Sequence, residues 1–258
     1  MNFGLQTFTI RKIQKKSIEK AYLPLVEMGI RELEIARIDF SMKNATAVKK
    51  MSEKYGIKPV SIQVKPKYIY GDPEKVISFC HATDCKNAVI SMLPFECILG
   101  SEDKFYRFVD TLDRQTELYA ENGITLAYHH HNWEYVSLSN GKTRMNELLS
   151  RTEKIRFVSD TYWTARSGIS PAKQINEFGD RLLGIHLRDL SHSPKGLSVI
   201  PGDTAVGRGV IDFFEVLSAA VNTTCEYAVI EQKTDTPYED IRYSYKTLQI
   251  INSQLKKG

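Results

Sequence analysis

Short apolar runs alternate with longer stretches of helical periodicity along the whole chain. The apolar runs recur at intervals of roughly thirty residues, and each is followed by a helix-like segment, which is typical of parallel βα units. The predicted strands begin near Phe3, Glu32, Pro59, Ala88, Ile124, Ile155, Leu182 and Tyr227. Because eight strands alternate with eight helices, we predict an α/β fold of the (β/α)8 TIM barrel type.

The joints between helices and strands support this pattern. The predicted helices span 17–28, 44–55, 73–83, 103–122, 144–150, 171–178, 213–220 and 238–255. Gly29, Gly56 and Gly123 each follow a helix and precede an isoleucine, where glycine can adopt the left-handed conformation that ends a helix. Asp72 and Ser170 each precede a proline, so we expect both side chains to cap the helix that follows.

No linker or low-complexity stretch divides residues 1–258, so we expect a single domain. An open doubly wound sheet is the alternative, because strand order cannot be deduced from spacing. However, neither GxGxxG nor GxxxxGK[ST] follows an early strand. The segment 207–209, Gly-Arg-Gly, lacks the third glycine and the helix of a nucleotide-binding turn, and we predict a loop there.

Composition limits the classes of partner. The formal net charge of +4 is spread along the chain, so neither nucleic acid nor a membrane surface is an expected partner. No apolar run has the length of a membrane span, and residues 1–6 lack the order of a signal peptide, so we expect a cytoplasmic protein. Cys80, Cys85, Cys97 and Cys225 have no clustered spacing and are predicted to be small core residues.

Candidate chemistry is most concentrated in 127–134, where a strand leads into a loop. This segment contains three of the six histidines of the chain. Side chains alternate along a strand, so His129 and His131 share one face and His130 lies on the other. Such a pair suits a divalent metal if further ligands come from elsewhere. The alternative is a solvated loop, or core histidines bonded to backbone carbonyls.

Three later strands also end on a polar residue, namely Asp160, His186 and Glu231. In a (β/α)8 barrel the carboxyl ends of the strands converge on one site. We therefore predict that His129, Asp160, His186 and Glu231 bind one divalent metal ion, with a donor set that suits manganese, zinc or cobalt. A single carboxylate such as Asp160 is also commonly a helix cap or an ion-pair partner.

Several segments together resemble a known family. They are 186–189 (His-Leu-Arg-Asp), Asp160 with Thr161, the strand that ends at Glu231, 207–213 and 129–134. Over nearly the whole chain they resemble the sugar phosphate isomerase/epimerase superfamily of xylose isomerase-like TIM barrels. The resemblance implies one ligand from each of the last four strands, and a metal that binds adjacent oxygens of a sugar or sugar phosphate. It also implies dimers or tetramers, so a homo-oligomer is an expectation.

The chain departs from the epimerases of this family at two positions. Their fifth-strand ligand is glutamate, and its equivalent here is His129, so Glu231 alone remains of the two glutamates that would exchange a proton with the sugar. The usual histidine three residues after the sixth-strand aspartate is here Trp163. Relatives with an HxHxxE-like segment include inosose dehydratase-like and keto-sugar-processing members. A lyase reaction is therefore an alternative to isomerisation.

Both reactions begin with removal of a proton from a carbon beside a carbonyl, which forms an enediolate that a divalent cation stabilises. The candidate bases are Glu231, His131 and Glu134, in that order for isomerisation. Arg188 is a candidate for binding an oxyanion or phosphate, or else an ion-pair partner. The candidate sugar contacts are Glu34, Gln63, Lys65 and Trp163. A polar surface explains the first three almost as well, and ordinary loop packing explains Trp163 at least as well.

Two other functions fit such a barrel. The first is an endonuclease that uses several zinc ions on abasic DNA, but six histidines and dispersed charge disfavour it. The second is a sugar-binding barrel without catalysis, suggested by the missing fifth-strand glutamate.

Overall fold

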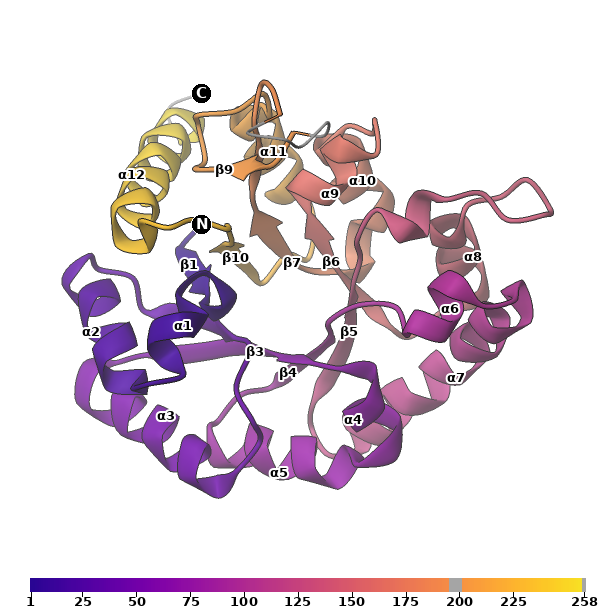
Figure 1. Cartoon of the computed structure of the whole chain (residues 1–258), viewed down its shortest axis with the longest axis horizontal. Helices are drawn as coiled ribbons and strands as arrows, with labels where there is room; N and C mark the ends of the chain where they lie inside the picture. The colour runs from indigo at the N-terminus through magenta and orange to yellow at the C-terminus, as the bar shows by residue number, and fades with distance from the viewer. Residues whose placement is uncertain (195–200, 257–258) are drawn as a thin grey trace.

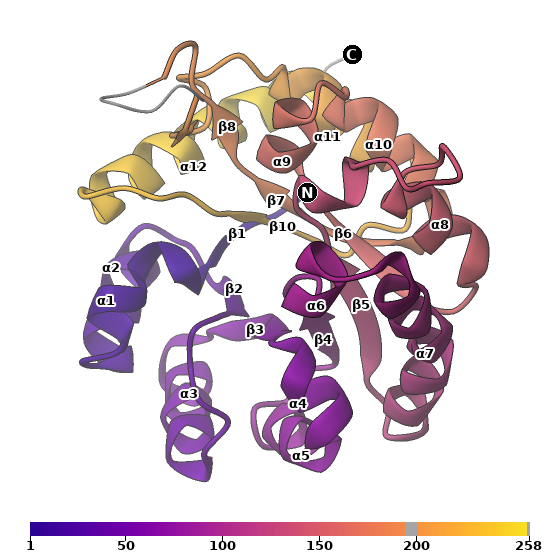
Figure 2. The ribbon, with the colours of Figure 1, turned by 45° about the vertical axis from the view of Figure 1, so that its right-hand side comes forward.

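Eight parallel strands close into a barrel in the order β1-β10-β7-β6-β5-β4-β3-β2, with helices around the outside (Figures 1 and 2). The structure is a computed structural model that describes residues 1–194 and 201–256. The barrel strands are β1 (Phe3–Gln6), β2 (Glu32–Ile35), β3 (Lys58–Val64), β4 (Asn87–Ile90), β5 (Thr125–His129), β6 (Arg156–Asp160), β7 (Leu182–Leu187) and β10 (Tyr227–Ile230). The predicted TIM barrel is confirmed, and the open doubly wound sheet is wrong.

The long helices lie where helical periodicity predicts them. They are α2 (Ile18–Glu27), α3 (Met42–Tyr55), α5 (Pro73–Ala82), α7 (Glu102–Glu121), α8 (Arg144–Arg151), α10 (Pro171–Phe178), α11 (Phe213–Ala220) and α12 (Pro237–Leu255). The short elements are not predicted by the sequence pattern. They are α1 (Arg11–Gln14), α4 (Pro66–Gly71), α6 (Phe95–Leu99), α9 (Thr161–Arg166), the hairpin of β8 (Asp189–Leu190) and β9 (Asp203–Thr204), and the 3-10 turns at Thr7–Ile10, Trp133–Tyr135 and Gly179–Arg181. These elements are too short to produce a periodic pattern.

The predicted helix ends are confirmed with one exception. Gly29, Gly56 and Gly123 have φ of +84°, +68° and +71°, as left-handed helix ends require. The Ser170 hydroxyl caps α10 by accepting from the amide of Lys173. The Asp72 side chain makes no capping hydrogen bond, so that prediction is wrong. The amide of Asp72 donates to the carbonyl of Tyr68 in α4, so Asp72 ends α4 directly before α5 begins. Its backbone therefore does not adopt the extended conformation of a helix cap.

Small and branched side chains fill the inside of the barrel and set the direction of the residues above them. Ala127, Val158 and Val229 belong to this interior cluster. Because side chains alternate along a strand, the residues two positions further on, His129, Asp160 and Glu231, also face the barrel axis at its carboxyl end. The interior is therefore apolar below and polar at the mouth.

Gly184 on β7 makes room for a large neighbour inside the barrel. It pairs with Tyr227 on β10, and a Cβ at position 184 would lie 2.4 Å from Cζ of that ring. The Tyr227 hydroxyl donates to Glu34 at 2.8 Å, so the ring cannot move without breaking a buried hydrogen bond. Only glycine fits beside this tyrosine.

The described residues bear on two further expectations. Cys80, Cys85 and Cys97 are buried, Cys225 is half-buried and all four are free, as predicted for core residues. Among the helices in residues 1–194 and 201–256, none combines the length and the apolar character that crossing a bilayer requires.

We predict that Gly184→Ala destabilises the protein by about 1–3 kcal/mol, because the added methyl group overpacks the barrel interior against Tyr227. Urea unfolding followed by circular dichroism measures the change. Gly71→Ala is the matched control, because a Cβ at position 71 meets no atom within 4 Å. Equal stability of the two variants would contradict the proposed packing constraint.

Candidate metal centre and cleft

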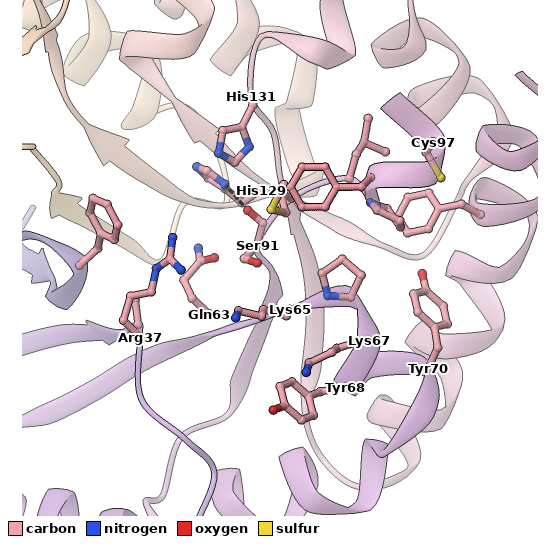
Figure 3. Close-up of a pocket in the computed structure, with 18 of the residues that line it drawn as sticks. Arg37, Gln63, Lys65, Lys67, Tyr68, Tyr70, Ser91, Cys97, His129 and His131 are labelled. Atoms are coloured by element: carbon pink, nitrogen blue, oxygen red, sulfur yellow. Dashed lines mark hydrogen bonds between the residues drawn. The ribbon is translucent and has the colours of Figure 1, made fainter. Parts of the chain in front are cut away.

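The carboxyl ends of the strands open onto a cleft of about 1370 Å³ (Figure 3). Most of the predicted site residues line it, namely Gln63, Lys65, His129, His131, Trp163, Arg188 and Glu231. Asp160 and His186 are fully buried and do not line the cleft. Glu34 and Glu134 do not line it either, and both are fully buried. The structure therefore places these two carboxylates behind the cleft wall, where they contact other side chains and not solvent.

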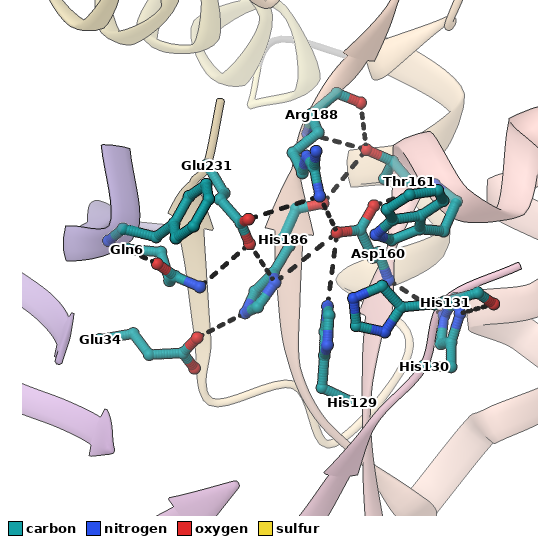
Figure 4. Close-up of polar contacts among 12 residues, drawn as sticks. Gln6, Glu34, His129, His130, His131, Asp160, Thr161, His186, Arg188 and Glu231 are labelled. Atoms are coloured by element: carbon teal, nitrogen blue, oxygen red, sulfur yellow. Dashed lines mark hydrogen bonds and ion pairs between the residues drawn. The ribbon is translucent and has the colours of Figure 1, made fainter. Parts of the chain in front are cut away.

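Four polar side chains meet at the mouth of the barrel, one from each of four neighbouring strands (Figure 4). His129 and Asp160 end β5 and β6, His186 lies on β7, and Glu231 follows β10. Each offers one ligand atom, and these atoms all lie within 4.8 Å of one another. We call these four residues the donor cluster. Within residues 1–194 and 201–256, no second group of three or more His, Cys, Asp or Glu converges in this way.

His186 lies between three carboxylates. Its Nε2 is 2.6 Å from Oε1 of Glu34, and its Nδ1 is 2.9 Å from Oε2 of Glu231 and 3.7 Å from Oδ2 of Asp160. Burial would lower the pKa of His186, but Glu34, Asp160 and Glu231 raise that pKa well above its usual value. The three carboxylates therefore favour a positive charge close to Nδ1 of His186.

Glu34 orients His186 from below. Besides His186, its carboxylate accepts hydrogen bonds from Ser61, Gln63 and Tyr227. Burial alone would raise the pKa of Glu34, but His186, Ser61 and Gln63 hold it below its usual value. The contact to Nε2 leaves Nδ1 of His186 directed at the donor cluster.

Arg188 balances the carboxylates from above. Its Nη1 lies 3.2 Å from Oδ2 of Asp160 and 3.4 Å from Oε1 of Glu231, and its Nη2 lies 2.8 Å from Oδ2 of Asp203. Although burial opposes ionisation, Arg188 holds the pKa of Asp160 well below its usual value and also lowers that of Glu231. The structure thus makes Arg188 an ion-pair partner of three carboxylates.

Asp160 and His129 are each fixed by a second contact. Oδ1 of Asp160 accepts from the amide of Trp163 at 3.0 Å and caps α9, so the helix-cap interpretation of Asp160 is confirmed and its role as a metal ligand stays a prediction. Nδ1 of His129 donates to the carbonyl of Ser91 at 3.2 Å, and its Nε2 lies 3.4 Å from Oδ2 of Asp160. The Ser91 contact fixes the ring nitrogen that bears the proton and directs the other toward the donor cluster.

The donor cluster fits a divalent metal. Two imidazoles and two carboxylates form the mixed nitrogen and oxygen set that manganese, zinc and cobalt accept. Nδ1 of His186 is buried and makes no directed hydrogen bond within the described chain, although Glu231 lies close by. A buried nitrogen without a hydrogen-bond partner is costly unless a ligand satisfies it.

The remaining histidines of the 129–134 segment have separate environments. His131 lies in the cleft with its ring centroid 5.0 Å from that of Trp163, and its Nδ1 is buried without a hydrogen-bond partner among the described residues. His130 lies on the other face, as predicted, where its Nε2 accepts from the amide of Asp160. Burial and the neighbouring His129 lower the pKa of His130 to about 3.

Glu134 holds this segment from behind. Its Oε2 accepts from the amide of His131 at 2.8 Å, and the hydroxyl of Tyr128 donates to its Oε1. Burial raises the pKa of Glu134. Its contacts therefore fix the backbone that presents His131.

Three residues that shape the site were not predicted from the sequence. Gln6 ends β1 and donates from Nε2 to Oε2 of Glu231 at 3.0 Å, and the rule of polar strand ends could have found it. Asp203 joins Arg188 to the amide of Lys233, but nothing in its sequence context indicates this. Asp189 accepts hydrogen bonds from the amides of three residues in the 207–211 segment, which forms a loop as predicted. These bonds join the 207–211 loop to the segment 186–189.

Comparison with known proteins supplies the family. Residues 23–251 match the family model described as the xylose isomerase-like TIM barrel. The chain belongs to this family. The predicted resemblance is thereby confirmed.

Two relatives by sequence are both named as inosose dehydratases. The inosose dehydratase of Geobacillus kaustophilus is 22% identical over 161 residues, which cover 56% of this chain and 50% of that protein. The one of Geobacillus thermodenitrificans is 28% identical over 176 residues, covering 58% and 55%. The matched region thus spans about half the length of these two relatives.

Solved structures share the fold. A sugar phosphate isomerase/epimerase from Parabacteroides distasonis superposes with a TM-score of 0.77 at 19% identity, over 96% of this chain and 93% of that chain. A probable 3-DHS dehydratase from Bacillus anthracis gives a TM-score of 0.72 at 13% identity, over 96% and 99%. At these identities the likeness concerns the fold alone.

We predict that Arg188→Met destabilises the protein by about 3–5 kcal/mol, because it leaves buried carboxylates without their cation. The control is Arg208→Met, which removes a half-exposed partner of Asp240, and we expect it to cost less than about 1 kcal/mol. Urea unfolding in the presence of a chelator measures both, so that metal binding does not contribute. A similar small cost for both variants would contradict the charge balance described here.

Proposed function

We propose that this protein is a divalent-metal-dependent isomerase or epimerase of a sugar or sugar phosphate that removes a proton from a carbon beside a carbonyl. The observation that carries this proposal is the buried convergence of His129, Asp160, His186 and Glu231 at the mouth of a barrel of this family. The adjoining cleft of about 1370 Å³ has ample room for a sugar.

The donor cluster would hold one ion of manganese, zinc or cobalt, and the ion would stabilise negative charge that develops on the sugar oxygens. The protein itself supplies the orientation of the ligands. Glu34 and the Ser91 carbonyl fix the two imidazoles, while Arg188 and Gln6 fix Glu231. Preorganised ligands cost no reordering when substrate binds.

Glu231 is our candidate for the group that takes the proton. Its carboxylate lines the cleft and is held at both oxygens, which places it against a bound sugar. His131 lines the same cleft and has an unpartnered Nδ1 among the described residues, so it is the candidate for returning or relaying the proton. Glu134 lies behind this wall, and we assign it the positioning of His131.

Elimination of water is the second candidate reaction. It is favoured by the two dehydratase relatives and by His131, which faces the cleft where it could protonate a departing hydroxyl group. The proton taken from carbon and the hydroxyl lost from the neighbouring carbon balance as water. Incubation of keto-sugars in D2O distinguishes the reactions, because isomerisation or epimerisation adds deuterium to carbon, whereas elimination gives an unsaturated ketone.

We predict that the purified protein contains about one tightly bound divalent ion per chain, because the four donors suit a single ion. Plasma mass spectrometry measures the metal content. Asp160→Asn should lose most of the metal, and the control Asp84→Asn, at an exposed position before β4 at the opposite end of the barrel, should retain it. About three ions per chain would favour the endonuclease, and none would favour a barrel that only binds sugar.

We predict that Glu231→Gln lowers the exchange of deuterium into any keto-sugar substrate by about 10²–10⁴-fold, because a positioned general base contributes that much. Circular dichroism and the melting temperature should show a folded protein. Glu239→Gln, at an exposed position in the first turn of α12, is the control and should retain activity. Full activity of Glu231→Gln would remove the role that we assign to Glu231.

A further inference from the structure

The residues that line the cleft carry an excess of positive charge that no ion pair neutralises within the described chain. Of the charged residues that line the cleft, Arg188 and Glu231 are paired with each other. Asp39 and Glu96 are the acidic residues that remain, against six basic ones, which are Arg37, Lys65, Lys67, Lys104, Arg107 and Lys233. In the part of the chain that the structure describes, none of these six forms an ion pair. Such a cleft attracts anions.

Arg37 adopts a backbone conformation that arginine rarely takes. Its φ is +58°, and within residues 1–194 and 201–256 the one other non-glycine residue with positive φ is Asp84. Aspartate tolerates this left-handed region, whereas a long side chain such as arginine is strained there. Strain of this kind persists where the surrounding structure enforces it, and it concentrates at functional sites.

Buried hydrogen bonds enforce the conformation at Arg37. The amide of the preceding Ala36 donates to the hydroxyl of Thr7 at 2.8 Å, and its carbonyl accepts from Nε2 of Gln14 at 2.7 Å. Gln14 is fixed in turn by the hydroxyl of Tyr22. These partners are buried, so the turn after β2 is held from inside the fold and does not result from surface packing.

The turn directs Arg37 into the cleft. Figure 3 shows its guanidinium beside the Gln63 amide, with Lys65 on the same wall. The guanidinium lies 5.2 Å from the ring centroid of Phe8, within the range of a cation–π contact. Arg188, by contrast, already contacts three carboxylates. Arg37 and Arg107 are therefore the arginines of this cleft whose guanidinium groups form no ion pair or hydrogen bond within the described chain, and Arg37 is the one that lies beside Gln63.

We propose that Arg37, assisted by Lys65, binds an anionic group of the substrate, either a phosphate monoester or a carboxylate. Both groups present oxygens that match the planar guanidinium, and the ammonium of Lys65 adds charge. The site lies where β2 and β3 leave the barrel, and the donor cluster comes from β5, β6, β7 and β10. This inference deepens the proposed function, since it names the class of sugar that the cleft accepts.

Isothermal titration calorimetry with four probes tests the proposal. The probes are glucose, glucose 6-phosphate, glucuronate and inorganic phosphate, added to the full-length protein at low salt. We expect at least one of the two anionic sugars to bind more tightly than glucose, and its affinity to fall as salt is added. The tighter anionic probe identifies the group as phosphate or carboxylate.

Arg37→Met should weaken binding of that probe by about 10- to 100-fold, as expected for loss of a charged hydrogen bond. Lys50→Met, which removes an exposed lysine of α3 outside this cleft, should leave the affinity unchanged. Arg37→Gly tests the strain separately: it should weaken binding as much as Arg37→Met, yet unfold at a temperature no lower than the wild-type protein.

Equal affinity for glucose and both anionic sugars would overturn the proposal, as would wild-type affinity in Arg37→Met. Neither readout uses turnover or metal content. Failure of the anion site is therefore distinguishable from failure of the donor cluster to bind metal, which the Asp160→Asn experiment measures.

Discussion

The contact between His186 and Glu34 is the interaction on which the site depends. It buries an imidazole and a carboxylate completely, 2.6 Å apart, between strands on different sides of the barrel. Two such groups are costly to remove from water unless every remaining lone pair and proton is satisfied. Donors from Ser61, Gln63 and Tyr227 complete the shell of Glu34, and the absent side chain at Gly184 leaves room for the tyrosine.

The contact between His186 and Glu34 also contributes to the distribution of charge at the carboxyl end of the barrel. With Glu34 below, and Asp160 and Glu231 beside it, His186 lies in a region of strong negative potential. Arg188 neutralises part of this charge from above and, through Asp203, ties the loop after β7 to the loop after β10. Carboxylates grouped closely around Nδ1 of His186, a buried nitrogen without a hydrogen-bond partner among the described residues, form an environment that stabilises a multivalent cation.

Much of this arrangement could be predicted from the sequence. Polar residues that close apolar runs identified His129, Asp160, His186 and Glu231, because carboxyl ends of parallel strands must meet in a barrel. The burial of Glu34 behind the cleft wall could not be predicted in this way. Glu34 lies one position before the end of β2, and a sequence does not show whether such a side chain reaches the cleft or ends beneath it. Its four partners come from segments far apart in the chain.

Local backbone geometry was the second feature that could not be predicted from the sequence. The left-handed turns at Gly29, Gly56 and Gly123 follow from the residue type, but nothing about an arginine indicates positive φ, so the turn at Arg37 was invisible in the sequence. The failure of Asp72 to cap α5 has a similar origin, because it depends on where α4 ends. Short helices such as α4 and α6 form walls of the cleft, yet span too few residues to leave a pattern.

The donor cluster and the cleft wall come from different parts of the chain. All four donors lie between residues 129 and 231, whereas Arg37, Gln63 and Lys65 follow the second and third strands. Buried links from Gln6 and Glu34 are the contacts through which these early strands reach the cluster. In the function that we propose, the residues that follow the second and third strands would therefore contact the anionic group of the substrate, while the last four strands would hold the metal ion.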